Sequence, residues 1–259
     1  VTARDHLTIH WTPEEVWTTV LSFCRMDPEL ARQAYDLGRD ARDWKVTLAQ
    51  QDLRDSGPDP TNLAPILYRP FDVRYTYYTG RSRGFICRPR PEVMRNMLAG
   101  NNLALMTCRQ ISQGVWSHAL VSNRITDDCM VSNRTRERGY LFPLYLHPRG
   151  QDGTAPFQAD MFQPTQSGRY PNLSPALLGQ LVIQYGREPT PAEIFSYVYA
   201  VLYTPTYRER YAQFLRTDLP RIPFPQDDGV FREMARLGER LVKLHLLEAT
   251  ELDRPIARF

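Results

Sequence analysis

Two stretches rich in proline and glycine divide this chain, and they constrain its fold more than any other feature. The first is Ser56–Pro60, and the second spans residues 148–171. Proline lacks a backbone N–H and glycine favours turns, so neither stretch can continue a helix or a central strand. Because the flanks have helical patterns and the middle has strand-like patterns, we predict an α+β fold. A mixed β-sheet would be flanked by N-terminal helices and a C-terminal helical subdomain.

The N-terminal flank, residues 1–57, has the signals that start helices. Thr12-Pro13-Glu14-Glu15 supplies an N-cap residue, a proline at the first helical position and an acidic first turn. Asp27-Pro28-Glu29 repeats this signal, and a third helix is predicted from Asp40 to Leu53. We therefore expect this flank to be a helical lead-in to the strand-rich middle of the chain.

Residues 58–147 alternate apolar and polar side chains in the manner of strands, and they are predicted to form a β-rich core. The connection at 148–171 separates this core from a helical subdomain at 172–259. Strands are predicted at 67–77, 103–107, 116–121, 129–131 and 141–146, with one short helix at 92–98. Helices are predicted at 174–185, 190–202, 207–215 and 228–248.

The cysteines argue against a zinc site and against secretion. Cys24, Cys87, Cys108 and Cys129 include no Cys-x-x-Cys pair and have no histidine cluster beside them, so free thiols in a reducing cytoplasm are expected. No apolar run approaches the roughly eighteen residues of a membrane helix, so we expect no membrane partner. The chain begins at Val1 without a signal-peptide pattern or an initiator Met, which suggests a processed product or a piece of a longer polypeptide.

Positive charge is concentrated in the middle of the chain. The segment Arg69–Arg138 has twelve arginines, no lysine and five acidic residues, a net charge of +7, whereas the whole chain has a formal net charge of +3. Arginine binds phosphate groups and guanine edges bidentately, so this segment is a candidate nucleic-acid surface. A solvated basic surface without a ligand is the alternative, and charge alone does not separate the two.

The candidate DNA contacts form two groups. Arginines clustered between turn-forming glycines suit phosphates, whereas polar loops after short strands suit base edges, because Arg reads guanine and Gln or Asn reads adenine. Any sheet has polar loops, so a purely structural role stays open. The predicted phosphate contacts are Arg81, Arg83, Arg88, Arg90, Arg95 and Arg136. The predicted base contacts are Arg109, Gln110, Ser112, Gln113, Asn123, Arg124, Asn133 and Arg134.

Catalytic motifs are missing from the sequence. It has no P-loop, no dinucleotide-binding glycine motif, no Gly-x-Ser-x-Gly elbow and no His-Glu-x-x-His pair. It also lacks the Asn-Pro-Pro-Tyr-type tetrapeptide of adenine methyltransferases and a nuclease core. Asp127-Asp128 is interpreted as a solvated turn rather than a metal pair, and His118 as a packed residue. We therefore predict a binding module with no catalytic residue, no metal and no cofactor of its own.

Several separate blocks of the sequence resemble the C-terminal specificity domain of Type ISP restriction-modification enzymes. In the middle of the chain these are Tyr68–Arg74, Arg88–Met94, Arg109-Gln110 and Leu141–Leu146. Further blocks follow at Asn172–Pro175, Ile194–Leu202, Tyr207–Tyr211, Asp218–Pro223 and Leu244–Glu248. The resemblance covers roughly residues 1–250.

This resemblance implies a function. In that family one bacterial polypeptide carries a nuclease, a translocating ATPase, an adenine-N6 methyltransferase and this last region, the target recognition domain. The chain would select the double-stranded DNA sequence to be methylated or cleaved, with the methyltransferase and motor/nuclease domains of the same polypeptide as partners. S-adenosylmethionine, ATP and Mg²⁺ would serve those other domains. The family has no fixed base-reading code, so the base contacts rest on chemistry and position.

Two other functions stay open at this point. The helical flanks could bind protein while the arginines are merely solvated, or the chain could be a diverged stand-alone DNA methyltransferase. A steep salt dependence of DNA binding would argue against the first, because phosphate contacts release counterions. Absence of methyl transfer from S-adenosylmethionine would argue against the second.

Overall fold

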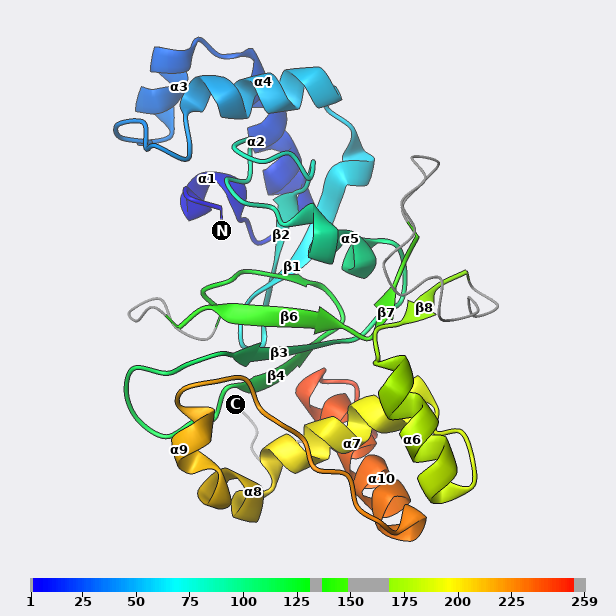
Figure 1. Ribbon diagram of the computed structural model, residues 1–259. Coiled ribbons are helices and arrows are strands. Elements are labelled where there is room, and N and C mark those ends of the chain that lie inside the picture. Colours follow the sequence, from blue (N-terminus) through cyan, green and yellow to red (C-terminus); the bar gives the residue numbers. More distant parts are fainter. Residues whose placement is uncertain (1, 131–136, 149–167, 254–259) are drawn as a thin grey trace. The chain divides into compact units, whose positions relative to one another are not determined.

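The computed structural model describes residues 2–130, 137–148 and 168–253 (Figure 1). They belong to two compact units, Val1–Leu98 with Arg124–Met130 (unit 1) and Ala99–Asn123 with Val131–Phe259 (unit 2). The predicted β-rich segment is therefore divided between the units, and the domain boundaries predicted at 57, 147 and 171 stay predictions. Within the described residues, each helix is too short or too polar to cross a bilayer.

Unit 1 opens with helices that start where the capping signals predict. Thr12 and Glu15 form a reciprocal capping box on the second helix, and Asp27 accepts hydrogen bonds from the first turn of the third. These local signals need no tertiary contact to act, which is why the sequence reveals them. The helices are α1 (Asp5–Thr8), α2 (Pro13–Arg25), α3 (Pro28–Ala34) and α4 (Val46–Ser56).

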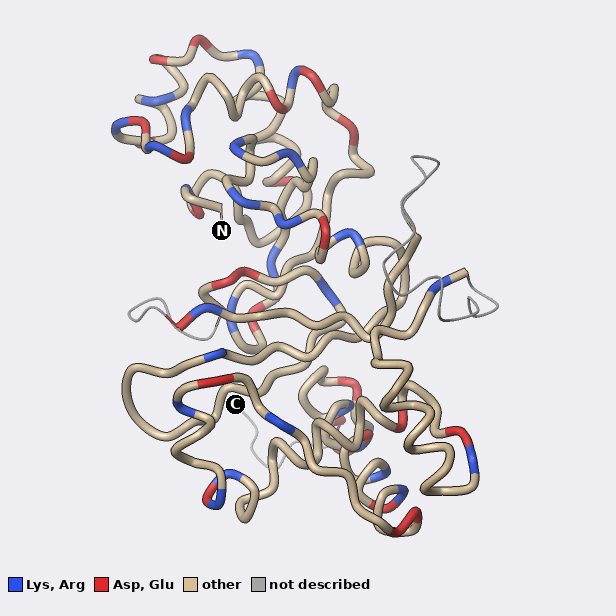
Figure 2. The backbone as a smooth tube through the Cα atoms, in the orientation of Figure 1, with Lys and Arg blue, Asp and Glu red and all other residues tan. Residues whose placement is uncertain are grey.

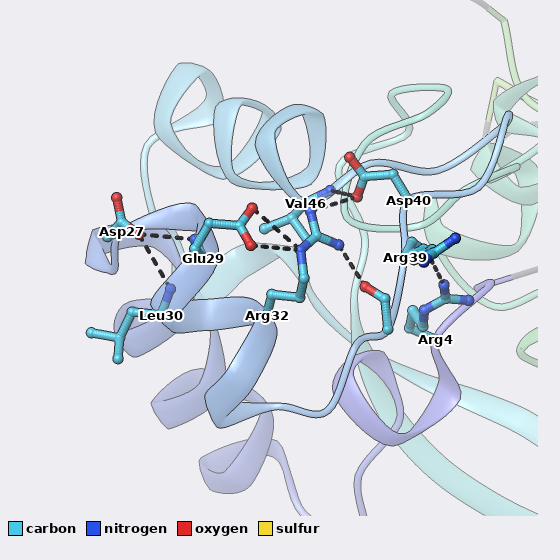
Figure 3. Close-up of polar contacts among 9 residues, drawn as sticks. Arg4, Asp27, Glu29, Leu30, Arg32, Arg39, Asp40 and Val46 are labelled. Atoms are coloured by element: carbon cyan, nitrogen blue, oxygen red, sulfur yellow. Dashed lines mark hydrogen bonds and ion pairs between the residues drawn. The ribbon is translucent and has the colours of Figure 1, made fainter.

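The predicted start of α4 at Asp40 is wrong, because Asp40 belongs to a turn that precedes the helix. Its carboxylate accepts from the Val46 N–H at 3.2 Å and lies 3.0 Å from the guanidinium of Arg32 (Figure 3). Arg32 also contacts Glu29 at 3.2 Å and donates to the Gly38 carbonyl at 2.6 Å. The contacts of Asp40, to residues six and eight positions away, hold this segment in place of helical hydrogen bonds.

The core of unit 1 lies between α2, α4 and a small mixed sheet. In the sheet, β1 (Leu63–Arg69) pairs with β2 (Asp72–Tyr77) antiparallel and with β5 (Ile125–Thr126) parallel. The predicted short helix is confirmed as α5 (Pro91–Leu98). Residues that are fully buried in this core include Val20, Phe23, Leu53, Tyr77 and Phe85.

Unit 2 has an antiparallel sheet with helices on one side (Figure 1). Its central strand β3 (Ala104–Cys108) lies between β4 (Ala119–Ser122) and β6 (Gly139–Pro143). A short pair, β7 (Tyr145–Leu146) and β8 (Tyr170–Pro171), follows. The helices are α6 (Pro175–Tyr185), α7 (Pro191–Tyr203), α8 (Pro205–Arg210), α9 (Ala212–Leu215) and α10 (Asp228–His245).

Helices α7 and α10 of unit 2 pack extensively against each other and approach closely at Gly238. A Cβ added to Gly238 of α10 would lie well under 3.0 Å from the Ser196 carbonyl oxygen of α7, so only glycine permits this approach. Apolar side chains of both helices, including Tyr197 and Phe231, pack in one cluster with Trp116 beside the sheet. This packing gives the loops at the end of the sheet a rigid support.

The predicted α+β class is confirmed, with differences in detail. The described strands form three small sheets rather than one mixed sheet. Residues 129 and 130 lie in a turn instead of a strand, because the Asp127 carboxylate accepts from the Cys129 N–H at 2.9 Å. The helix predicted at 207–215 is broken at Tyr211 into α8 and α9.

Candidate nucleic-acid interface

The segment Thr79–Arg90 of unit 1, here termed the arginine loop, holds four of the predicted phosphate contacts. The side chain of Asp52, on α4, holds this loop by hydrogen bonds. Its carboxylate, in a residue only 2% exposed, accepts from the Thr79 hydroxyl and from the Phe85 N–H, both at 2.8 Å. A Cβ at Gly84 would clash with this carboxylate. Glycine at this position therefore allows the loop to lie against the helix.

Two arginines of this loop have acidic partners in the helical region before β1. Arg81 pairs with Asp55, and Arg88 pairs with Asp43. The Arg81 side chain lowers the pKa of Asp55, while Arg42 and then Arg88 lower the pKa of Asp43. Figure 2 shows acidic and basic positions interspersed in this unit. A phosphate group would have to compete with these carboxylates.

The other arginines of the predicted phosphate group differ in exposure. Arg83 is exposed, and it has no acidic partner among the residues that the structure describes. The Arg90 side chain is 65% exposed and lies 3.9 Å from Glu92, a distance that makes only a weak ion pair. Arg95 is half-buried on α5, and Arg136 lies outside the described residues. Arg83 and Arg90 are thus the most available cations of this group.

Residues 109–118 of unit 2 connect β3 to β4 and form the second candidate surface, the β3–β4 loop. Ile111 and Trp116 are 7% and 2% exposed and anchor the loop in the helical core. The Ile111 N–H donates to the Arg216 carbonyl at 3.1 Å. The four residues between these anchors, Ser112 to Val115, are all exposed. Figure 1 shows the loop extending beyond the ends of the strands.

Glu137, which precedes β6, holds the β3–β4 loop by hydrogen bonds. Gly139 pairs with Cys108 at the end of β3, so the register brings Glu137 to the point where the loop leaves the sheet. Its carboxylate accepts from the Ser112 N–H at 2.8 Å and from the Ser112 hydroxyl at 2.9 Å. Glu137 is only 7% exposed, so its carboxylate is fixed in a mostly buried position from which it makes these charge-assisted hydrogen bonds. The Ser112 hydroxyl, predicted to contact a base, is committed to this carboxylate.

His118, the last residue of the β3–β4 loop, lies near the same Glu137 carboxylate. Its Nδ1 accepts from the Ser117 N–H at 3.2 Å, so the neutral ring carries its proton on Nε2, which lies 3.7 Å from Glu137. Burial lowers the pKa of His118, although the nearby carboxylate opposes this effect. The ring is half-buried and adjoins Trp116, which agrees with the prediction of a packed residue.

A polar depression of about 300 Å³ lies beside the first residues of the loop. Arg109, Gln110, Arg138, Tyr140 and Thr217 line it. The Arg109 side chain is 63% exposed, and its Nε lies 3.4 Å from Asp218. A guanidinium held through Nε has further donors on its two Nη atoms, the arrangement that suits the O6 and N7 atoms of guanine.

Three residues of this depression were missed at the sequence level. Arg138 was counted only in the net charge of the segment, and Tyr140, which is 46% exposed, was placed just before the strand predicted at 141–146. Pairing of Tyr140 with Thr107 places β6 beside β3, and the contact of Ile111 with Arg216 brings Thr217 to the loop. Both contacts join distant parts of the chain, so no local pattern indicates them.

The remaining predicted base contacts lie apart from this depression. Gln113 is exposed near the tip of the β3–β4 loop. Asn123 follows β4 and donates to the Glu248 carboxylate at 3.0 Å, and the half-buried Arg124 begins the second segment of unit 1. Asn133 and Arg134 lie outside the described residues. The structure thus brings Arg109 and Gln110 together, with Ser112 and Gln113 on the same loop.

Asp127, Asp128 and Cys129 offer three ligand atoms within 4.8 Å of one another. Asp127 lies 3.3 Å from Arg69 and also accepts from the Cys129 N–H. The prediction of a turn is confirmed, but the prediction that it is solvated is wrong, because Asp127 is 4% exposed. Burial raises the pKa of Asp127. Its contacts to Arg69 and Cys129 give it a structural role in the turn.

Solved structures that share the fold of this chain include three with DNA or a DNA mimic bound. One is a DrdV–DNA complex, with a TM-score of 0.63 and 22% sequence identity over 95% of this chain. The second is the ATP-dependent Type ISP restriction-modification enzyme LlaBIII bound to DNA, with a TM-score of 0.67 and 17% identity over 99% of this chain. The third is a nuclease-deletion mutant of the Type ISP restriction-modification enzyme LlaGI in complex with a DNA substrate mimic, with a TM-score of 0.56 and 20% identity over 95% of this chain. The chain covers only 22%, 16% and 21% of those chains, respectively.

The family follows from the sequence itself. No curated protein matches the chain. The family model of the Type ISP C-terminal specificity domain, however, matches residues 1–259, which is the whole sequence. The resemblance first drawn from separate sequence blocks is thereby confirmed over the full length. The chain belongs to the family of Type ISP C-terminal specificity domains.

Proposed function

We propose that this chain recognises a specific sequence in double-stranded DNA, as the target recognition domain of a Type ISP restriction-modification enzyme. Family membership and the DNA-bound state of the three similar structures support the proposal. The observation that carries it is the β3–β4 loop, which exposes hydrogen-bonding side chains from a support fixed by a buried carboxylate. Fixed supports favour specificity, because little conformational entropy is lost on binding.

The two candidate surfaces have different tasks in this proposal. Arg109 contacts a guanine, while Gln110 and Gln113 contact adenines, since these side chains match the major-groove edges of those bases. Arg83 and Arg90 contact phosphates, which fixes the position of the domain on the duplex without reading its sequence. Arg138 and Tyr140 extend the reading surface around Arg109.

The chemistry belongs to other domains of the same polypeptide. Adenine-N6 methylation and DNA cleavage would be directed by this domain and performed by methyltransferase and motor/nuclease domains that use S-adenosylmethionine, ATP and Mg²⁺. A bacterial cytoplasmic location fits the four free cysteines, Cys24, Cys87, Cys108 and Cys129, since thiols stay reduced there.

Binding of the 259-residue chain to DNA tests the proposal. We expect selection from a pool of random-sequence duplexes to enrich one sequence, which then binds at least roughly a thousandfold more tightly than a scrambled duplex. Arg109→Ala should reduce discrimination at one base pair, whereas Arg83→Ala should weaken binding to both duplexes equally. Enrichment of no sequence would contradict the proposal.

A protein-interaction module is the second candidate function. The pairs Arg81–Asp55 and Arg88–Asp43 favour it, because they neutralise half of the arginine loop. The salt dependence of DNA binding distinguishes the two candidate functions. A domain that contacts several phosphates must bind DNA less tightly as salt rises, with a slope of about −0.9 per phosphate contact on logarithmic axes. An affinity for DNA that does not change with salt would favour the interaction module.

A further inference from the structure

The tip of the β3–β4 loop carries an apolar side chain that hydrogen-bond readout does not explain. Val115 is 81% exposed, although Ile111 and Trp116 on the same loop are buried. It follows Gly114, whose positive φ of 74° turns the chain at this point. Its side chain therefore lies in the exposed part of a loop whose two ends are fixed.

Packing within the folded chain does not account for Val115. An apolar side chain stabilises a protein by leaving water, and at this exposure Val115 contributes little. The loop already has two buried anchors, and Glu137 holds it through the Ser112 N–H at 2.8 Å. The position of Val115 is thus determined by its neighbours, while its own methyl groups remain available to a ligand.

We propose that Val115 contacts the 5-methyl group of a thymine in the major groove of the target. This inference rests on the proposed function. The thymine methyl is the only apolar group among the base edges of that groove, and short apolar side chains recognise it by contact. Valine is stiff at χ1, so it loses little freedom on binding. The neighbouring Gln113 is exposed as well and can donate and accept hydrogen bonds beside that contact.

The chemistry therefore assigns a thymine to the target sequence. Arg109, Gln110 and Gln113 select bases by hydrogen bonds, whereas Val115 selects by apolar contact. The Glu137 support matters for this readout because a methyl contact is short-ranged and requires the tip to be held in place. Loss of one buried methyl contact corresponds to roughly a three- to tenfold change in affinity.

Uracil substitution tests this inference, since uracil lacks only the 5-methyl group of thymine. The probe is the duplex that the wild-type chain selects from a random pool, with each thymine replaced singly by uracil. We expect one replacement to weaken wild-type binding by roughly three- to tenfold. Val115→Ala should bind the thymine duplex and that uracil duplex equally, while Val115→Ile should keep the difference.

A matched control is available on α6. Ile183 is 86% exposed in the same unit, so Ile183→Ala removes an equally exposed apolar side chain away from the loop. This variant should respond to uracil as the wild-type chain does. An unchanged thermal unfolding midpoint for Val115→Ala confirms that the loop variant is folded.

The outcomes separate this inference from the proposed function. If the wild-type chain selects a sequence but no uracil replacement weakens binding, or if Val115→Ala keeps the full uracil effect, the assignment of Val115 is overturned. If Val115→Ala leaves DNA binding unchanged at every position, Val115 has another partner and the inference is wrong. If the wild-type chain selects no sequence at all, the proposed function itself fails.

Discussion

Two loops in this molecule are each fixed by one buried carboxylate, yet they differ in what their exposed side chains meet. Asp52 accepts two hydrogen bonds from the arginine loop, and Glu137 accepts two from the β3–β4 loop. In the arginine loop, however, Arg81 and Arg88 already pair with acidic residues of the same unit. In the β3–β4 loop the one arginine, Arg109, also lies near an acidic residue, Asp218, but the other exposed hydrogen-bonding groups are neutral.

Because two of its four arginines are paired, we expect the density of arginines to overstate how strongly the arginine loop binds DNA. The arginine loop is the most basic stretch of the sequence, but its local field is reduced by Asp43 and Asp55. The β3–β4 loop has a single arginine, Arg109, and it is the better candidate for reading bases. Fixed geometry and free hydrogen-bonding groups determine recognition more than net charge does.

The largest expected effect comes from Gly84→Ala in the arginine loop. The added Cβ would clash with the Asp52 carboxylate, which is buried and hydrogen-bonded and so cannot move away. We expect the free energy of unfolding to fall by about 1–3 kcal/mol or more, measured by urea denaturation. In the other unit, Gly139→Ala meets only the flexible end of Met106 and should cost less.

Gly179→Ala is the control for this pair, because an added Cβ on α6 would meet nothing within 4 Å. It should stabilise the chain by about 0.5–1 kcal/mol, since alanine favours helices over glycine. Equal costs for Gly84→Ala and Gly139→Ala would contradict the inference that the Asp52 carboxylate yields less readily than the Met106 side chain.

The next effect concerns the support of the β3–β4 loop. Glu137→Ala removes the acceptor of both Ser112 hydrogen bonds, and we expect discrimination between the selected duplex and single-base variants to fall by roughly tenfold or more. The salt slope of binding should stay unchanged, because no phosphate contact is lost. Glu137→Gln keeps an acceptor oxygen for Ser112 and should retain most of the discrimination. A loss of affinity that is equal for all duplexes would contradict the positioning role.

The acidic partners provide a smaller effect in the opposite direction. Asp55→Asn and Asp43→Asn should release Arg81 and Arg88 for phosphates and steepen the salt dependence of DNA binding by up to about one unit per released arginine. Arg83→Ala should make the slope shallower by about one unit, since Arg83 has no acidic partner in the described part of the chain. Unchanged slopes in the two asparagine variants would mean that the arginine loop does not contact phosphates.

The smallest effect is a pH dependence of stability. Asp43 and Asp55 have folded-state pKa values below the ordinary 3.8, so their ion pairs stabilise the fold above that pH and are lost as pH falls through the lowered values. The urea midpoint of Asp43→Asn/Asp55→Asn should therefore lie slightly below that of the wild-type chain at pH 7. The difference should begin to shrink near pH 3.8 and vanish only once the pH lies below the lowered pKa values of both aspartates. A difference that does not shrink as the pH falls below 3.8 would show that other contacts cause it.

The sequence predicted features that depend on neighbouring residues and missed those that depend on distant ones. Thr12 and Thr190 cap helices through residues three positions away, and these helices begin where predicted. Asp40 was misread as a helix start because its partner Arg32 is brought near only by folding. Arg109 and Gln110 were chosen for their chemistry, whereas Tyr140 joins them through strand pairing and Thr217 through a contact between loops.

The central claim is that the β3–β4 loop reads the DNA sequence. Mapping of methylated adenines in genomic DNA, from cells with and without the gene for the full-length enzyme, would give the target of the wild-type protein. The same mapping should then be done for a variant in which Arg109 and Gln110 are exchanged. We predict that methylation moves to a sequence that differs at one or two base pairs. Methylation of the unchanged wild-type sequence would contradict the account.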